Sequence, residues 1–227
     1  MNYLHQFVFG IYPYIALAIF LLGSLIRFDR EQYSWKSESS QLLYRGQLRL
    51  GNILFHIGIL GLFFGHLFGL LTPVAFWDYI GVSHHAKQIF AMSAGGIMGT
   101  VGLIGLLILI VRRFSSVRLN VNSTWRDKLV LIWLLITLLL GLSTIVVSSQ
   151  HTDGKEMVSL MTWAQHILTF RGDAASYIVN ASPVFKFHLF MGMSLFVIFP
   201  FTRLVHIWSG FGTLTYLRRS PQLVRRR

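Results

Sequence analysis

The sequence predicts an all-α membrane protein in which five transmembrane helices form a bundle, with the N-terminus outside and the C-terminus in the cytoplasm. Hydrophobic residues make up 54% of the 227 residues. Charged residues make up only 12%, about half their share in a typical soluble domain. Mean hydropathy is +0.59. The apolar residues gather in long runs, and the basic residues concentrate in alternate loops.

Five apolar stretches are long enough to cross a bilayer. A helix rises about 1.5 Å per residue, so a hydrocarbon core about 30 Å thick needs about 20 apolar residues. The expected spans cover residues 3–26, 51–71, 88–111, 128–148 and 185–208. The first lacks a basic n-region and a small-residue cleavage site, so we expect a retained span rather than a signal peptide. Residues 1–227 are expected to form one domain that ends in a basic cytoplasmic tail over 209–227.

The distribution of Lys and Arg predicts the orientation. One side of the membrane is expected to carry only Lys87, Lys155, Arg171 and Lys186. The other 16 of the 20 basic residues lie in the first and third loops, at the end of the last span and in the tail. Basic residues concentrate in cytoplasmic loops, so this second side is expected to face the cytoplasm. The same bias accounts for the net charge of +12, because every basic stretch adjoins an expected span. A nucleic-acid partner is therefore not needed to explain the charge.

The loop between the fourth and fifth spans is about 36 residues long and contains apolar residues at helical spacing. These residues are Met157, Leu160, Met161, Ala164, Ile167 and Leu168. Two arrangements fit the pattern: a short amphipathic helix on the outer membrane surface, or a helix packed on the bundle.

The absence of cysteine narrows the possible metal chemistry. It excludes disulfides, Cys-ligated iron–sulfur clusters, thiolate zinc sites and covalent c-type haem. Any metal bound by this chain must use His or carboxylate ligands. Iron–sulfur clusters on the same electron path would belong to another subunit.

Four histidines lie inside the expected spans, two on each of two helices. His56 and His66 belong to the second span, and His188 and His206 belong to the fifth, whereas every Asp and Glu falls outside. An ionisable side chain in a membrane helix is costly and indicates a function. The alternative is that each imidazole only hydrogen-bonds a neighbouring helix. Four histidines in this arrangement favour a functional site.

The two helices run in opposite directions, which matches His66 with His188 near the outside and His56 with His206 near the cytoplasm. Each pair can offer two imidazole nitrogens to one iron, from opposite faces of a porphyrin. A zinc site would need three or four ligands at one point. The pattern therefore predicts two b-type haems that act as electron carriers. His188 and His206 are 18 residues apart, which is five turns and about 27 Å on a continuous helix.

Glycines are frequent on the second span. Gly61, Gly65 and Gly69 form a face that is expected to pack closely against another helix. Gly65 lies beside His66 and could instead clear space for a porphyrin.

Longer strings add to this pattern along nearly the whole chain: "IYPYIALAIFLLGS", "FDREQYSWKSESSQLL", "NILFHIGILGLFFGHLFGLLTP", "AKQIFAMSAGG", "WAQHILTF" and "FKFHLFMGMSLFVIFPFTRLVHIWS". Together with the histidines, they resemble the gamma (cytochrome b) subunit of the membrane-bound respiratory nitrate reductase. The resemblance implies a subunit of the cell inner membrane that carries two haem b groups. Such a subunit oxidises quinol at the outer side. It passes the electrons to a cytoplasmic iron–sulfur beta subunit, and a molybdenum-containing alpha subunit then reduces nitrate to nitrite.

The resemblance also implies residue roles. His66 and His188 match the axial ligands of the outer (distal) haem. His56 and His206 match those of the inner (proximal) haem. Lys87, in "AKQ", matches the family's quinol-site lysine, and the quinol is either menaquinol or ubiquinol.

The loop before Lys87, "VAFWDYIGVSHH", departs from the family pattern, which leaves the quinol preference open. Asp78, His84 and His85 in this region are either proton relays or solvated loop residues. Arg203, which lies about one turn before His206, is either a partner for a haem propionate or an anchor at the lipid interface.

The basic tail, "LRRSPQLVRRR", either docks the cytoplasmic subunit or binds anionic lipid. Other functions share part of the overall pattern. One is the dihaem b subunit of a membrane hydrogenase or formate dehydrogenase, which the co-purifying catalytic subunit would identify. Another is a transporter that moves protons or metal through its histidines, which would be colourless. A purely structural membrane anchor is a third.

Overall fold

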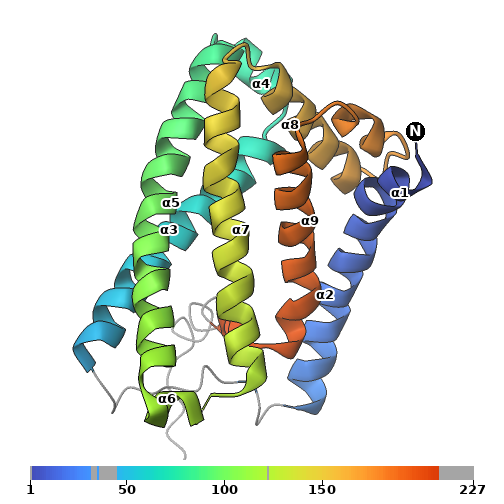
Figure 1. Cartoon of the computed structure of the whole chain (residues 1–227). Coiled ribbons are helices and arrows are strands. Elements are labelled where there is room, and N and C mark those ends of the chain that lie inside the picture. Colours follow the sequence, from blue (N-terminus) through green and yellow to red (C-terminus); the bar gives the residue numbers. More distant parts are fainter. Residues whose placement is uncertain (1, 32–34, 36–44, 122, 210–227) are drawn as a thin grey trace, which may run out of the picture.

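Five long helices lie side by side in the computed structural model of the chain and form a bundle (Figure 1). The structure describes residues 2–31, 35, 45–121 and 123–209. Within these residues every regular element is a helix, and five helices are long and apolar enough to cross a membrane. The predicted fold class, an all-α membrane protein with five spans, is confirmed. The predicted basic tail lies outside the described residues, apart from Ser209.

Most spans are longer than the apolar segments that predict them. The first consists of α1 (Tyr3–Gln6), η1 (Phe7–Ile11) and α2 (Tyr12–Arg30), and the next three are α3 (Arg45–Leu71), α5 (His84–Ser115) and α7 (Trp125–Gln150). A helix extends past the apolar run until a capping residue ends it. At the start of α7, the Thr124 side chain accepts a hydrogen bond from the Asp127 N–H, and the Asp127 carboxylate accepts one from the Thr124 N–H.

The fifth span differs from the prediction because it is not one continuous helix over residues 185–208. α9 covers Pro183–Ile198, and two short 3₁₀ helices follow, η4 (Phe199–Phe201) and η5 (Arg203–Val205). Pro200 lies in this break and has no backbone N–H to continue the helical hydrogen bonds. The expectation that His188 and His206 lie five turns apart on a continuous helix is therefore wrong.

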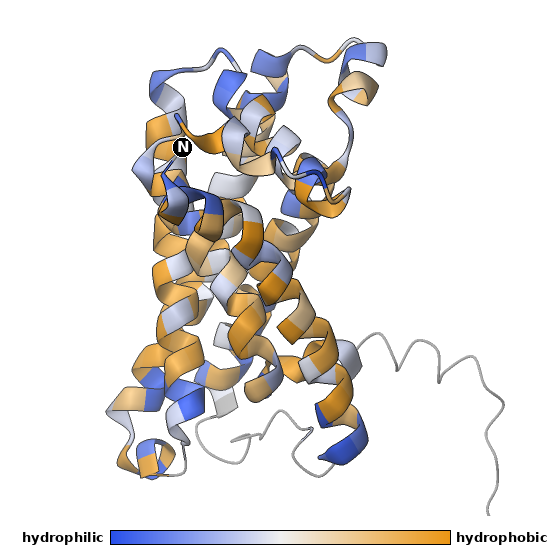
Figure 2. Ribbon diagram, turned by 90° about the vertical axis from the view of Figure 1, so that its right-hand side faces the viewer, coloured by the Kyte–Doolittle hydropathy of each residue, from blue (hydrophilic) through white to orange (hydrophobic). Residues whose placement is uncertain are grey.

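Short helices lie at both ends of the bundle (Figure 1). α4 (Val74–Tyr79), α8 (Lys155–Leu168) and η3 (Ala174–Ile178) lie at one end, which we call the α8 end. α6 (Val117–Val121) lies at the opposite end, which we call the α6 end. Hydrophobic residues cover the middle of the bundle and hydrophilic residues gather towards both ends (Figure 2), as expected if a bilayer surrounds the middle.

α8 packs on the bundle, which favours the second of the two arrangements predicted for its loop. Its apolar face belongs to a buried cluster that contains Phe9, Leu160, Trp163, Ala164, Ile167, Ala174, Ala175, Ile178 and Ala181. Full burial of a side chain such as leucine or isoleucine stabilises a fold by about 1.5–3 kcal/mol. In the last turn of the helix, His166 hydrogen-bonds Asp173 over 2.8 Å and holds the pKa of that carboxyl below its ordinary value.

α3 and α5 approach each other so closely that glycine is required where they cross. A Cβ atom on Gly58 would lie 2.3 Å from the backbone nitrogen of Gly102. A Cβ atom on Gly105 would lie 2.3 Å from the backbone nitrogen of Phe55. No side chain fits at either position, so the two backbones contact each other directly.

The glycine face predicted on the second span is only partly confirmed. A Cβ atom on Gly61 would meet the Met98 side chain at 2.7 Å, whereas one on Gly65 or Gly69 would meet nothing within 4 Å. Gly58 makes the tight contact instead, because α5 crosses α3 at residues that precede Gly65 and Gly69. Gly65 therefore has open space on its surface beside His66.

Candidate functional site

His66 and His188 face each other towards the α8 end of the bundle. His66 lies five residues before the end of α3, and His188 lies five residues after the start of α9. Their ring centroids are 6.1 Å apart, with 41° between the ring planes. The structure thus brings these two residues together in the pair predicted from the opposite directions of the helices.

His56 and His206 form a second pair, nearer to the α6 end. His56 lies on α3, and His206 directly follows η5. Their ring centroids are 6.3 Å apart, with 69° between the planes. The break in the fifth span therefore does not separate this pair.

All four imidazoles use the same nitrogen for a bond to the backbone. In each case Nδ1 is 2.5–3.0 Å from a carbonyl oxygen, which can only accept a hydrogen bond, so Nδ1 carries the proton. The acceptors are Asn52 for His56, Leu62 for His66, Thr137 for His188 and Arg203 for His206. The Nε2 lone pair is then available for a metal, in the arrangement usual for ligating histidines.

The spacing of the rings suits an iron with two axial histidines. An imidazole nitrogen binds a transition metal at about 2.0–2.1 Å, so two rings in line across one metal have centroids about 6 Å apart. Both pairs have this spacing. Among the described residues, no group of three or more His, Cys, Asp or Glu could hold a metal ion. The donor set therefore fits a haem, which brings four nitrogens of its own, and it does not fit a tetrahedral zinc site.

Lys87 is buried at the α8 end, where α3, α4, α5 and α8 meet. Only 6% of it is exposed. Its Nζ atom donates hydrogen bonds to the Gly69 carbonyl at 3.2 Å and to the Met161 sulfur at 2.9 Å, and lies 4.3 Å from the centre of the Trp77 ring. Gly69 follows His66 by three residues on α3, less than one turn. The predicted quinol-site lysine is therefore close to the pair formed by His66 and His188 along α3.

The polar residues around Lys87 hold the loops of the α8 end together. Asp78 and His84 bond to each other over 3.0 Å, and His85 bonds the Thr152 carbonyl at 2.6 Å. The Gln88 side chain donates to the carbonyls of Ser148 and His151 and accepts from the Gly154 N–H. These contacts give Asp78, His84 and His85 a role in loop structure, and the proton-relay role stays a prediction.

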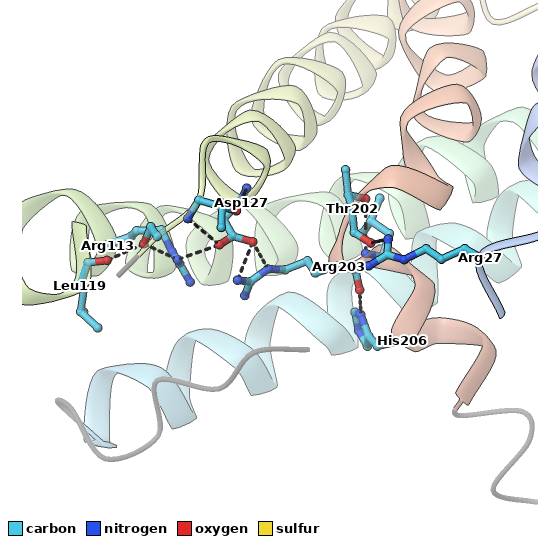
Figure 3. A network of polar contacts seen from close by, with 10 residues as sticks. Arg27, Arg113, Leu119, Asp127, Thr202, Arg203 and His206 are labelled. Carbon is cyan, nitrogen blue, oxygen red and sulfur yellow. Dashed lines mark hydrogen bonds and ion pairs between the residues drawn. The ribbon is translucent and has the colours of Figure 1, made fainter. Parts of the chain in front are cut away.

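Arg203 contacts the carboxylate of Asp127, which the hydropathy pattern predicts to lie outside the spans. Its Nε and Nη2 atoms lie 2.7 and 2.6 Å from Asp127 Oδ1, and Arg113 Nη1 lies 3.8 Å from Oδ2 (Figure 3). Asp127 is in the first turn of α7 and is 6% exposed. The expectation that every acidic residue lies outside the spans is therefore wrong. The α7 span begins three residues earlier than predicted, and two arginines compensate the buried charge.

Comparison with known proteins identifies the family. A match to the family described as nitrate reductase gamma subunit covers residues 5–227. The chain belongs to the nitrate reductase gamma subunit family. The match spans almost all of the sequence, including both histidine pairs and Lys87.

Named relatives of this gamma subunit agree with the family assignment. It is 48% identical to the respiratory nitrate reductase 1 gamma chain of Escherichia coli K12, over 100% of both chains. It is 47% identical to the respiratory nitrate reductase 2 gamma chain of the same organism, over 100% of this chain and 99% of that one. The nitrate reductase gamma chain of Bacillus subtilis is 35% identical over 98% of each chain.

Sequence reasoning missed one residue of this gamma subunit that contacts the break in the fifth span. Arg27, at the end of α2, donates from Nη1 to the carbonyls of Pro200 and Thr202 at 2.7 and 2.8 Å (Figure 3). Both carbonyls lie where η4 ends and η5 begins, and the guanidinium supplies them with a hydrogen-bond donor at this break. The available signal was Pro200 within an apolar run, which predicts unpaired carbonyls that need a donor.

Proposed function

We propose that this gamma subunit is the membrane cytochrome b subunit of a respiratory nitrate reductase in the cell inner membrane. It holds two haem b groups, oxidises quinol at its outer, α8 end and delivers electrons at its cytoplasmic, α6 end. There it contacts an iron–sulfur beta subunit, and a molybdenum-containing alpha subunit reduces nitrate to nitrite. The respiratory gamma chains among its relatives support this role. The excess of Lys and Arg in the loops of the α6 end supports the orientation.

The two histidine pairs carry the proposal. In each pair the rings have the spacing that one iron requires, and a backbone carbonyl holds Nδ1 so that Nε2 can ligate. When bound on His66 and His188 and on His56 and His206, the two haems supply one-electron carriers that link the two membrane faces. Each pair would offer two imidazole ligands to one haem, and a haem held in this way would carry electrons rather than bind oxygen.

Lys87 supports quinol binding beside the outer pair. Its ammonium group has three N–H donors, and the bonds to Gly69 and Met161 use two of them. The third can donate to a quinol oxygen. Oxidation of quinol to quinone releases two electrons and two protons, and at the α8 end the protons leave on the outer side.

A dithionite-reduced minus oxidised difference spectrum of the purified complex, with the haem-to-protein ratio, tests the proposal. We expect a b-type spectrum and two haems for each gamma chain. The complex should also contain subunits that reduce nitrate. A colourless chain would contradict the proposal and would favour a transporter. Two haems together with a hydrogenase or formate dehydrogenase subunit would contradict the nitrate reductase assignment alone.

Replacement of Lys87 by Ala tests the quinol site. A hydrogen bond from a charged group contributes roughly 1.5–3 kcal/mol, so we expect quinol oxidation by the complex to fall roughly 10- to 100-fold in kcat/KM. Both haems should be retained. Lys155→Ala is the control, because that side chain is at the same end of the bundle but is 87% exposed. Loss of haem in Lys87→Ala, or equal effects of the two substitutions, would argue against the assigned role.

A further inference from the structure

The middle of α7 contains a glycine that lies directly against the His188 ring. A Cβ atom on Gly141 would be 2.9 Å from Cε1 of His188, 3.4 Å from Nδ1 and 3.5 Å from Nε2. Real Cβ atoms essentially never come within 3.0 Å of a heavy atom of another, non-neighbouring residue. The imidazole therefore occupies the volume that the smallest possible side chain on residue 141 would take.

The imidazole cannot move aside without losing other contacts. Its Nδ1–H donates to the carbonyl of Thr137 at 3.0 Å, one turn before Gly141 on the same helix. On its other side is His66, with the ring centroids 6.1 Å apart. A displacement of the ring away from α7 would lengthen its hydrogen bond to the Thr137 carbonyl and shorten its distance to the His66 ring. The ring is thus held between the two neighbouring helices.

Three residues of α7, spaced four positions apart, contact α9. Trp133, Thr137 and Gly141 share one face of the helix, because residues four apart lie above one another. The Trp133 indole N–H donates to the carbonyl of Met191 on α9 at 3.0 Å. This bond fixes α9 against α7 less than one turn from His188, so the imidazole and its helix are positioned together.

His188 differs from the other three histidines in the origin of the carbonyl that accepts the hydrogen bond from Nδ1. His56 and His66 donate to carbonyls four residues earlier on α3, and His206 donates to one three residues earlier. Each of these rings is oriented by its own segment. The orientation of His188 depends on another helix, and it therefore depends on how closely the ring can approach that helix.

We propose that Gly141, together with the Thr137 carbonyl, positions His188 as the ligand of the outer haem. The absence of a side chain on residue 141 lets the imidazole reach the α7 backbone, and the Thr137 carbonyl then fixes the proton on Nδ1. Nε2 is thereby directed at the iron shared with His66. This role rests on the proposed function, because it assumes that the outer pair holds haem.

The substitution Gly141→Ala in the complete complex tests this role. The added Cβ should displace the imidazole, so we expect one haem per gamma chain in place of two, or an outer haem whose low-spin resonance and midpoint potential are shifted. The resonance of the inner haem should be unchanged, which also shows that the chain is folded. Gly141→Val, with a larger side chain, should give the more complete loss.

Gly96→Ala is the matched control. It adds the same methyl group on the adjacent α5, where the new Cβ would be 3.7 Å from the Ile145 side chain, an ordinary contact. Both haems should be retained in this variant. Retention of both unaltered haem signals in Gly141→Ala, or loss of both haems together, would overturn the positioning role. Absence of haem from the unsubstituted complex would instead overturn the proposed function itself.

Discussion

At the scale of single residues, the four histidines share one feature. In each of them, Nδ1–H donates a hydrogen bond to a backbone carbonyl. This contact selects the tautomer with a free Nε2 and limits rotation of the ring. The sequence could predict which histidines pair, because span direction and position along the helix are enough for that. It could not predict the carbonyl partner of His188, which lies 51 residues away on another helix.

The pairing predicts a pattern of haem loss. His66→Ala and His188→Ala should remove the same haem, and His56→Ala and His206→Ala should remove the other, because each haem loses one of its two axial ligands. Paramagnetic resonance of the oxidised complex distinguishes the two low-spin centres, and pigment analysis counts them. His151→Ala, which changes an exposed ring outside the spans, should leave both. If a substitution of His66 removed the same centre as one of His56, the pairing would be wrong.

For Lys87, the resemblance to a known family predicts a role but not the contacts of the side chain. Its position in "AKQ" predicts a role in quinol binding and the charge distribution predicts the outer side of the membrane, and both stay predictions. Its burial against Gly69, Met161 and Trp77 was not predictable, because these contacts come from three other helices. Met161 in particular was assigned to a helix whose placement the sequence left open.

At the scale of elements, the break after α9 decides where His206 lies. The hydropathy pattern continues across it, since residues 185–208 are mostly apolar, and a span predicted from hydropathy alone is therefore continuous. Pro200 was the local signal for the break, since proline removes a helical hydrogen bond. The donor that replaces this bond, Arg27, comes from the first span, and no spacing rule links residues so far apart in the sequence.

Arg27→Met should disturb the inner haem and not the outer one. Methionine keeps much of the apolar stem and removes the donors, which leaves the buried carbonyls of Pro200 and Thr202 without Nη1. Each buried group without a partner costs about 1–3 kcal/mol, so the turn that presents His206 should loosen. We expect a lower occupancy or a shifted midpoint potential of the inner haem in a redox titration. Arg30→Met, at an 81% exposed side chain on the same helix, should have no effect, and an equal effect would contradict the prediction.

At the scale of the whole molecule, the two ends of the bundle are held by different forces. An apolar cluster joins α8 and η3 to the first span at the α8 end. At the α6 end, Asp127 joins the first turn of α7 to α5 through Arg113 and to η5 through Arg203. The number of spans was predictable because the bilayer sets a length for each. These contacts between distant segments were not predictable, since they depend on how the helices are arranged around one another.

Asp127→Asn should destabilise the bundle at the α6 end. The substitution leaves two partly buried arginines, Arg113 and Arg203, without their counter-charge. Removal of one partner from a fully buried ion pair costs about 3–5 kcal/mol, so we expect a smaller loss of stability here. We expect a lower melting temperature of the solubilised complex. Asp29→Asn provides the control, because that carboxylate is 74% exposed and its ion pair with Arg30 is at the surface. An unchanged melting temperature for Asp127→Asn would show that the arginines find other partners.

The backbone contact between α3 and α5 has a consequence for the rate of electron transfer. α3 supplies one ligand to each pair, and Gly58, which touches Gly102, lies between His56 and His66. With no flexible side chain between the two backbones, α3 cannot slide or tilt without breaking van der Waals contact with its neighbour. Tunnelling slows exponentially as donor and acceptor move apart. A rigid α3 would thus keep the distance between the two haems constant. Thermal motion of the surrounding lipid would then hardly change the rate of electron transfer between them.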